Sequence, residues 1–174
     1  MPSGALGRIT RRGTAVAAAL VLAMAASTTP ALAHWNGTGQ DIASIHIYPY
    51  SYNSTWQTPL NRALSNWNAT SSPANFYKSS NSGSTLTVKS YSNTWYGYYT
   101  RCGGMCMYVK LNSRTINRDA SNWANFVTSV FVHELGHALN LAHNSVTSIM
   151  NHSRNRNGMI KPQPHDVSDV NAYY

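Results

Sequence analysis

One short segment constrains the fold of this 174-residue chain more than any other, because it gathers histidines around the only glutamate of the sequence. His133 and His137 are four residues apart, a spacing that brings two side chains onto one face of an α-helix. Glu134 lies between them, and His143 follows six residues after His137. Two imidazoles on one helical face can bind the same metal ion, and the adjacent carboxylate can reach a water molecule on that ion. The segment therefore predicts a helix that carries a metal site.

A third ligand requires the chain to reverse its direction after this helix. A helix that continued past His137 would carry His143 away from the metal ion. Asn140 stands where the turn is needed, and asparagine tolerates the left-handed backbone conformation better than most residues other than glycine. A catalytic zinc ion takes three protein ligands and keeps one position for water. Because the chain has no second glutamate, we predict one zinc ion bound by His133, His137 and His143.

This run of residues resembles the zinc-binding motif of the metzincins, in which a third histidine follows the His-Glu-x-x-His segment. It is most similar to the matrixin branch, that of the matrix metalloproteases and their short secreted bacterial relatives. Ser148-Ile149-Met150 likewise resembles the methionine turn that lies beneath the metal in this family. The likeness is specific over Val132–Met150, and it is weaker over Tyr108–Asn112 and Asp166–Tyr174.

Three differences separate the chain from typical matrixins. Asn140 replaces the glycine of the family turn, no long propeptide is expected ahead of residue 34, and the few acids do not supply the structural zinc and calcium sites of the animal enzymes. The fold that the resemblance implies is a metzincin-like single domain of the α+β class. In it a twisted mixed β-sheet packs with two long helices. The active-site helix ends in the turn to the third histidine, and the methionine turn at Met150 and a C-terminal helix follow.

The same resemblance implies a secreted zinc-dependent endopeptidase. Glu134 would act as general base on a zinc-bound water that attacks the peptide carbonyl, and it would then pass the proton to the leaving amine. The substrate would pair with an edge strand just before the zinc helix, for which the matching segment is Met107–Asn112. The alternatives are a secreted binding or adhesion module without catalysis and a zinc hydrolase of non-peptide amides. A structural zinc site needs no general base, so Glu134 argues against the first alternative.

Residues 1–33 have the features of a secretory signal peptide. Three arginines precede an apolar run over residues 14–26 that is too short to span a bilayer. Ala31-Leu32-Ala33 matches the small-residue pattern of a cleavage site. Ordinary secretion is the prediction, with twin-arginine export and a membrane anchor as alternatives. Residues 34–174 would then form the catalytic domain in the extracellular space.

The segment that remains after such a cleavage is mildly basic. It holds ten of the thirteen Lys and Arg residues and all five acids, which gives a net charge of +5. Without a dense basic run or a nucleic-acid motif, we expect no nucleic-acid partner. We expect a monomer that acts on a protein or peptide substrate and does not contact membranes. Cys102 and Cys106 predict a disulfide in an oxidising compartment, and a thiol that blocks the metal is the alternative.

Residue periodicity predicts the other elements. Alternating apolar and polar side chains indicate strands over residues 41–48, 85–91, 95–100 and 107–111. The second and third of these are expected on either side of a turn at Ser92-Asn93. The segment 71–84, rich in Ser, Asn, Pro and Gly, is expected to be a loop. Helical spacing and start signals indicate helices that open at Thr58-Pro59, near Ser121 or Asn122, and at Pro164-His165-Asp166.

Several polar residues near the C-terminus are open to two interpretations. His152 closely follows the methionine turn, and we expect it at the surface, with the surroundings of the metal as the alternative. Asp166 and Asp169 either cap the last helix, where the helix dipole favours acids, or brace the methionine turn as acids of matrixins do.

Overall fold

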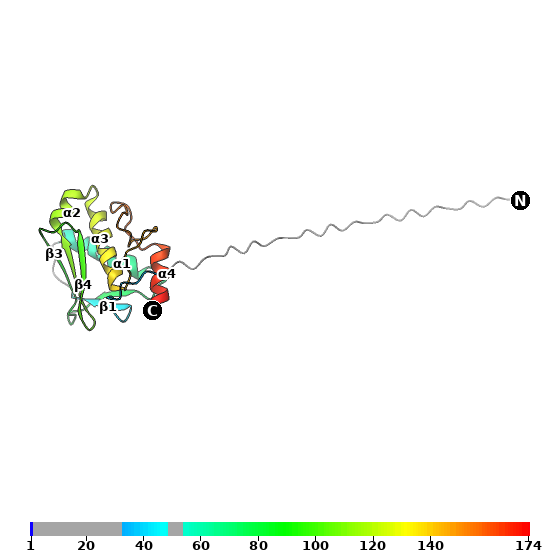
Figure 1. Ribbon diagram of the computed structural model, residues 1–174, viewed down its shortest axis with the longest axis horizontal. Coiled ribbons are helices and arrows are strands. Elements are labelled where there is room, and N and C mark those ends of the chain that lie inside the picture. Colours follow the sequence, from blue (N-terminus) through cyan, green and yellow to red (C-terminus); the bar gives the residue numbers. More distant parts are fainter. Residues whose placement is uncertain (2–32, 49–53) are drawn as a thin grey trace. The chain divides into compact units, whose positions relative to one another are not determined.

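Helices and strands alternate irregularly along the part of the chain that the computed structural model describes, which is Met1 with residues 33–48 and 54–174 (Figure 1). The helices are α1 (Ser54–Asn68), α2 (Ser113–Asp119), α3 (Trp123–Ala138) and α4 (Pro164–Tyr173). The strands are β1 (Ser44–Ile47), β2 (Asn75–Lys78), β3 (Thr85–Lys89), β4 (Gly97–Gly103) and β5 (Cys106–Asn112). This is an α+β arrangement, as predicted. Almost all of the expected signal peptide lies outside the described residues.

The described strands form two sheets rather than one. β1 pairs with β2 in parallel, and β5 lies between β3, which is parallel to it, and β4, which is antiparallel. β3 and β4 do lie on either side of a bend at Ser92-Asn93, as predicted, but they do not pair with each other, because β5 lies between them in the sheet. Asn112 explains the arrangement: its side chain accepts a hydrogen bond from the Tyr91 N–H and donates one to the Asn93 carbonyl, so the connecting segment crosses the end of β5.

The prediction that Met107–Asn112 is an edge strand is also wrong. β5 is hydrogen-bonded on both sides, and the fully buried Met107, Val109 and Leu111 point to one face of it. Among the described residues, β4 forms one edge of this sheet, and it contacts α3. Any strand-like pairing of a peptide near α3 therefore involves β4.

Other elements also differ from the predictions, and α2 was not predicted at all. The segment expected to be a loop contains β2, in which Phe76 alone is buried. The Asn68 side chain binds the Phe76 backbone twice: it accepts a hydrogen bond from the Phe76 N–H and donates one to the Phe76 carbonyl. α1 begins at Ser54, ahead of the predicted start, so that Pro59 lies inside the helix. Pro59 has no N–H and cannot donate a helical hydrogen bond. The lost bond lies near the amino-terminal end of the helix, where it is tolerated more readily than in the centre.

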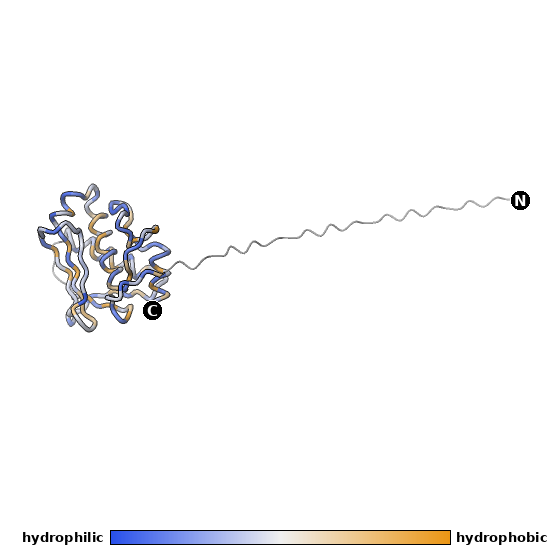
Figure 2. The backbone as a smooth tube through the Cα atoms, viewed as in Figure 1, coloured by the Kyte–Doolittle hydropathy of each residue, from blue (hydrophilic) through white to orange (hydrophobic). Residues whose placement is uncertain are grey.

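α3 is the core helix. It begins at the predicted place, where the Asn122 side chain accepts a hydrogen bond from the Asn125 N–H. It packs against α1 and, on another side, against β4 and β5. The Trp67 indole of α1 donates to the Val132 carbonyl at 2.9 Å, which fixes the two helices against each other. Figure 2 shows the apolar run along this helix in the interior of the fold. Among the described residues, no helix is long and apolar enough to cross a membrane.

Candidate metal centre

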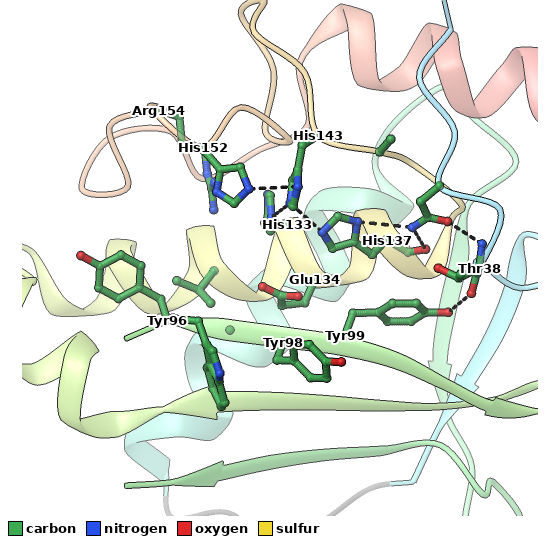
Figure 3. A pocket seen from close by; sticks show the side chains of 15 residues that line it. Thr38, Tyr96, Tyr98, Tyr99, His133, Glu134, His137, His143, His152 and Arg154 are labelled. Carbon is green, nitrogen blue, oxygen red and sulfur yellow. Dashed lines mark hydrogen bonds between the residues drawn. The ribbon is translucent and has the colours of Figure 1, made fainter. Parts of the chain in front are cut away.

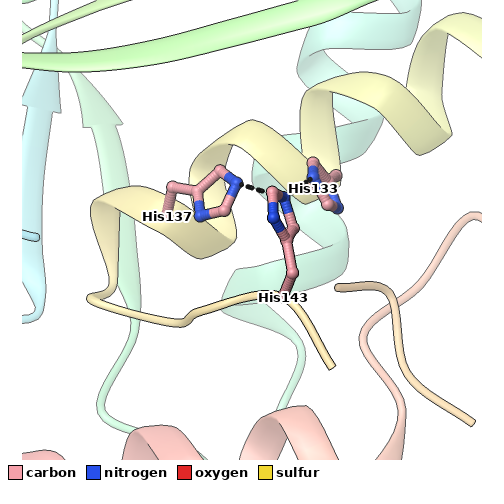
Figure 4. A group of neighbouring side chains, drawn as sticks. All are labelled: His133, His137 and His143. Atoms are coloured by element: carbon pink, nitrogen blue, oxygen red, sulfur yellow. Dashed lines mark hydrogen bonds between the residues drawn. The ribbon is translucent and has the colours of Figure 1, made fainter. Parts of the chain in front are cut away.

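Three imidazoles meet at the C-terminal end of α3 (Figure 4). His133 and His137 lie one turn apart on the helix, and His143 returns from the following loop. The Nε2 atom of His143 lies 3.1 Å from Nε2 of His133 and 3.0 Å from Nε2 of His137. Ligand atoms around a tetrahedral zinc ion with bonds of about 2.0 Å are separated by about 3.3 Å. The structure thus brings together the three histidines that the sequence singled out.

The turn after α3 has the geometry that this return requires. Asn140 has a φ of 65°, the left-handed conformation expected for it. The Asn140 N–H donates to the His137 carbonyl and the Leu141 N–H donates to the Gly136 carbonyl, both at 3.0 Å. These two bonds are those of a Schellman motif, which ends a helix and reverses the chain. Asparagine therefore takes the place of the usual glycine in this turn.

A segment far away in the sequence supports the turn. Residues 34–40, here named the amino-terminal strap, run along it: the Asn36 N–H donates to the Asn140 carbonyl at 2.8 Å, and the Ala142 N–H donates to the His34 carbonyl at 2.7 Å. The Gly39 N–H donates to the Asn140 side chain at 3.1 Å. The strap thus satisfies polar groups of the loop that would otherwise lack partners after the helix ends.

The outer nitrogens of two histidines fix which tautomer is present. His133 Nδ1 lies 2.9 Å from the Ile149 carbonyl, and His137 Nδ1 lies 2.8 Å from the Leu141 carbonyl. A carbonyl only accepts, so each Nδ1 carries the proton and each Nε2 presents a lone pair. Both lone pairs face Nε2 of His143, which can donate to at most one of them. A cation at this point satisfies all three nitrogens, and the donor set is one that zinc takes.

Partial removal from water favours the uncharged, metal-binding form of these imidazoles, of which His133 is buried, His137 half-buried and His143 exposed. It lowers the pKa of His137 and of His143 to about 4. The pKa of His133 lies well below its usual value, because of burial and then the charge of Arg154. At neutral pH no proton competes for the three ligand nitrogens.

The third imidazole has a fourth as its partner. His152 Nε2 lies 2.9 Å from His143 Nδ1, and the two ring centroids are 3.8 Å apart. If His143 Nε2 binds a metal, the proton of the ring is on Nδ1, and this N–H donates a hydrogen bond to His152 Nε2. His152 is exposed, as predicted, and it also belongs to the surroundings of the three histidines.

Glu134 directly follows His133 in the sequence, and it is buried, with 5% of its surface exposed. Burial raises the pKa of its carboxyl group to about 8, while Arg154 and Arg156 oppose the shift. β4 approaches it closely at Gly97, where a methyl group in place of the hydrogen would collide with the Glu134 carboxylate and with Val130. A glycine at this position leaves the space that the carboxylate occupies.

Ser148-Ile149-Met150, the segment predicted as a methionine turn, packs against α3 at Gly136. Met150 is fully buried, and its sulfur fills the space that a side chain at position 136 would occupy. Asp166 braces the turn, since it accepts hydrogen bonds from the Ser148 hydroxyl and the Ile149 N–H, and it also forms the capping box of α4 with Gln163. Asp166 therefore combines the two roles proposed for it, whereas Asp169 contacts His34 instead.

A cleft of about 510 Å³ opens beside the three histidines (Figure 3). α3 forms one wall with Glu134, and the opposite wall consists of Tyr98 and Tyr99 of β4 with Tyr96, which immediately precedes that strand. Arg154 also lines it, although the side chain is 7% exposed. Its guanidinium donates to the Ser129 hydroxyl and carbonyl, each at 3.2 Å, and burial lowers its pKa to about 9. The cleft therefore joins a metal-type donor set, a buried acid and a buried cation.

Among the cleft residues that sequence reasoning missed, Gly97 and Arg154 lie nearest to the proposed chemistry of Glu134. Gly97 had a signal, since an isolated glycine in the aromatic run 95–99 indicates that another part of the chain approaches closely. Arg154 had none, because its burial depends on how the segment after the methionine turn folds over α3.

The cysteines lie away from this cleft, in the hairpin between β4 and β5. Cys102 and Cys106 form a disulfide with a Cα–Cα distance of 5.3 Å, within the usual range. Gly103 and Gly104 make the turn between them with φ angles of 98° and 52°. Both sulfurs are used in this bridge, so neither is a thiol that could block a metal.

Comparison with known proteins supports the fold and leaves the activity open. No protein-family model and no curated protein matches the chain. A chain of the GM1-bound form of the ECX AB5 holotoxin is similar in structure, with a TM-score of 0.52 and 11% identity over 75% of this chain and 79% of that chain. High choriolytic enzyme 1, a hatching-enzyme zinc protease of the medaka fish Oryzias latipes, matches at 22% identity and a TM-score of 0.39, over 64% of this chain and 50% of that one. The first likeness is one of fold alone, and the second is too low to carry an argument.

Proposed function

We propose that the chain is a zinc-dependent endopeptidase of the metzincin type. One observation carries the proposal: three imidazole Nε2 atoms converge within coordination distances, in a cleft that also holds the only glutamate of the chain. Three histidine ligands leave one coordination position open, which is the arrangement of catalytic rather than structural zinc sites.

His133, His137 and His143 are the proposed ligands. A zinc ion held by them would supply Lewis acidity, which makes a water molecule a stronger nucleophile and polarises a substrate carbonyl. The hydrogen bonds from His133 Nδ1 to the Ile149 carbonyl and from His137 Nδ1 to the Leu141 carbonyl keep the rings in place and make their Nε2 atoms better donors.

Glu134 is the proposed general base and, later, the proton donor to the leaving amine. With a pKa of about 8 in the chain alone, its carboxyl group holds a proton at neutral pH. A dication at the three histidines would lower this pKa, because the positive charge favours the ionised form. The side chain would then be a carboxylate whose pKa remains close enough to neutrality both to take a proton and to return it.

β4 is the proposed substrate platform. It is an edge strand of its sheet, it runs along the cleft, and Tyr98 and Tyr99 line the same wall. An extended peptide can add to such an edge through its own backbone, which places a peptide carbonyl between β4 and the histidines. This strand edge favours a peptide substrate over a small non-peptide amide.

The substitution Glu134→Gln tests this proposal. It keeps the size and most of the packing of the side chain but removes the base, so we expect the loss of at least about 1000-fold in casein cleavage, with zinc content unchanged. Asp41→Asn is the matched control, because it removes a carboxylate that is 69% exposed at its side chain. Cleavage is measured by fluorescence release with and without a chelator, and zinc by elemental analysis. If Glu134→Gln still cleaved casein at the rate of the control, the assignment of the base would be wrong.

A further inference from the structure

A second group of metal-type side chains lies where the amino-terminal strap contacts α4. It consists of His34 in the strap and of His165 and Asp169, one helical turn apart on α4. Asp169 Oδ2 lies 3.8 Å from His34 Nδ1 and 3.5 Å from His165 Nε2, and these two nitrogens are 3.4 Å apart. The side chain of His34 is 36% exposed, that of His165 is 12% exposed and that of Asp169 is 4% exposed.

These distances suit a shared cation better than direct hydrogen bonds. Hydrogen bonds from a ring N–H to an oxygen have lengths of about 2.7–3.2 Å. Both distances to Asp169 Oδ2 are longer than this, and the two ring nitrogens, at 3.4 Å, make at most a long hydrogen bond. All three distances are close to the separation of about 3.4 Å expected for neighbouring ligand atoms on a tetrahedral ion with bonds of 2.0–2.2 Å. They thus surround a point at which each could make a bond of normal length to one ion.

We propose that His34, His165 and Asp169 form a second metal site, which fastens the amino-terminal strap to α4. Two imidazoles and a carboxylate are ligands for late divalent transition metals such as Zn²⁺ and Cu²⁺. The site is separate from the three histidines of the cleft, and it does not depend on the proposed peptidase activity.

The amino group of His34 supplies a fourth donor if the chain is cleaved after Ala33, as its sequence predicts. The backbone nitrogen of His34 already lies 3.2 Å from Asp169 Oδ2. A free amino group there and Nδ1 of the same residue would close a six-membered chelate ring on one ion. Four protein ligands with no open position are the mark of a structural site, in contrast to the three-ligand site of the cleft.

A metal at this place would order the loop that carries His143. The strap is bonded to that loop through the His34 carbonyl, which accepts from the Ala142 N–H, and through Asn36, which donates to the Leu141 carbonyl. Independent contacts also hold the strap on α4, since the Trp35 indole donates to the Asp169 carbonyl and stacks edge-on against Tyr173. Removal of one metal ligand should therefore leave the fold intact.

Counting zinc ions separates the two sites. The exported protein, with its first residue identified by mass spectrometry, is stripped with a chelator, dialysed against buffered Zn²⁺ and analysed for zinc per chain. We expect two ions for the wild type, one for His165→Gln, one for His143→Gln and none for the double variant. His46→Gln, which removes an imidazole from β1, is the control and should keep two. Circular dichroism checks that each variant is folded.

The outcomes distinguish failure of either proposal. One ion in the wild type that is lost in His143→Gln and kept in His165→Gln would overturn the second site and leave the peptidase proposal standing. One ion in the wild type that is lost in His165→Gln and kept in His143→Gln would support the second site and contradict the proposed zinc centre of the cleft. The variant His34→Gln, at the partly exposed end of the strap, provides an independent check. Its zinc affinity at this site should fall by about 100-fold or more, since even an outer-sphere change costs 10–100-fold, and unchanged affinity would contradict the proposal.

Discussion

His143 differs from the other two proposed ligands in what holds its outer nitrogen. His133 and His137 donate to backbone carbonyls, whose positions are fixed by the methionine turn and by the turn after α3. His143 instead meets the side chain of His152, which is exposed and whose ring lies against it at an angle of 53°. A partner of this kind can be replaced without disturbing the backbone, so the value of the outer hydrogen bond can be measured directly at this one residue.

We predict that the acceptor at position 152 determines part of the zinc affinity. His152→Phe keeps an aromatic ring against His143 but removes the acceptor, and we expect zinc affinity to fall by about 10–100-fold. His152→Gln offers a carbonyl oxygen to the same N–H and should recover most of this loss. Competition with a chromogenic chelator measures both. Equal affinities for the two variants would show that His152 acts by packing alone.

At the scale of elements, the sequence predicted well those features that depend on residues close together in the chain. The spacing of His133 and His137 fixes a helical face, and Asn140 ends that helix by a preference of its own backbone, so both follow from a few neighbouring residues. The order of strands in a sheet is different, because it depends on pairs of segments far apart in the chain. Nothing within Met107–Asn112 tells whether one or both of its edges are paired, and the assignment of the edge strand failed for this reason.

The close approach of β4 to α3 leads to a prediction for Gly97. Gly97→Ala would push its new methyl group into the Glu134 carboxylate. The flexible carboxylate can move aside more easily than the two backbones, so we expect zinc to stay bound and kcat/KM for a peptide to fall by on the order of 100-fold, as for a catalytic group displaced by about 1 Å. Gly83→Ala is the control, because a methyl group there meets Cys106 at an ordinary 3.7 Å. Loss of zinc along with activity would point instead to damage of the whole centre.

At the scale of the whole molecule, folding buries groups whose proton affinities change in opposite directions. The pKa of His137 and of His143 falls from 6.5 to about 4, and that of Glu134 rises from 4.5 to about 8, burial being the main cause in each case. Between pH 4 and 6.5 the unfolded histidines bind more protons than the folded ones, so the stability they contribute is lost as pH falls through this range. Between pH 4.5 and 8 the folded Glu134 binds more protons, so its contribution is lost as pH rises.

These opposite slopes predict that the metal-free chain is most stable near pH 6.5. Below pH 6.5 the unfolded histidines together take up more protons than the folded Glu134 does, so the free energy of unfolding should fall as the pH falls. Above pH 6.5 the difference in bound protons comes mainly from Glu134, so the free energy of unfolding should fall as the pH rises. Glu134→Gln should abolish the decline between pH 6.5 and 8 and leave the decline toward pH 4 in place. Urea unfolding of the chelator-treated protein at a series of pH values measures both slopes. A wild-type curve that keeps rising to pH 8 would mean that Glu134 is already ionised in the folded, metal-free chain, and that the cleft supplies a base without the help of a cation.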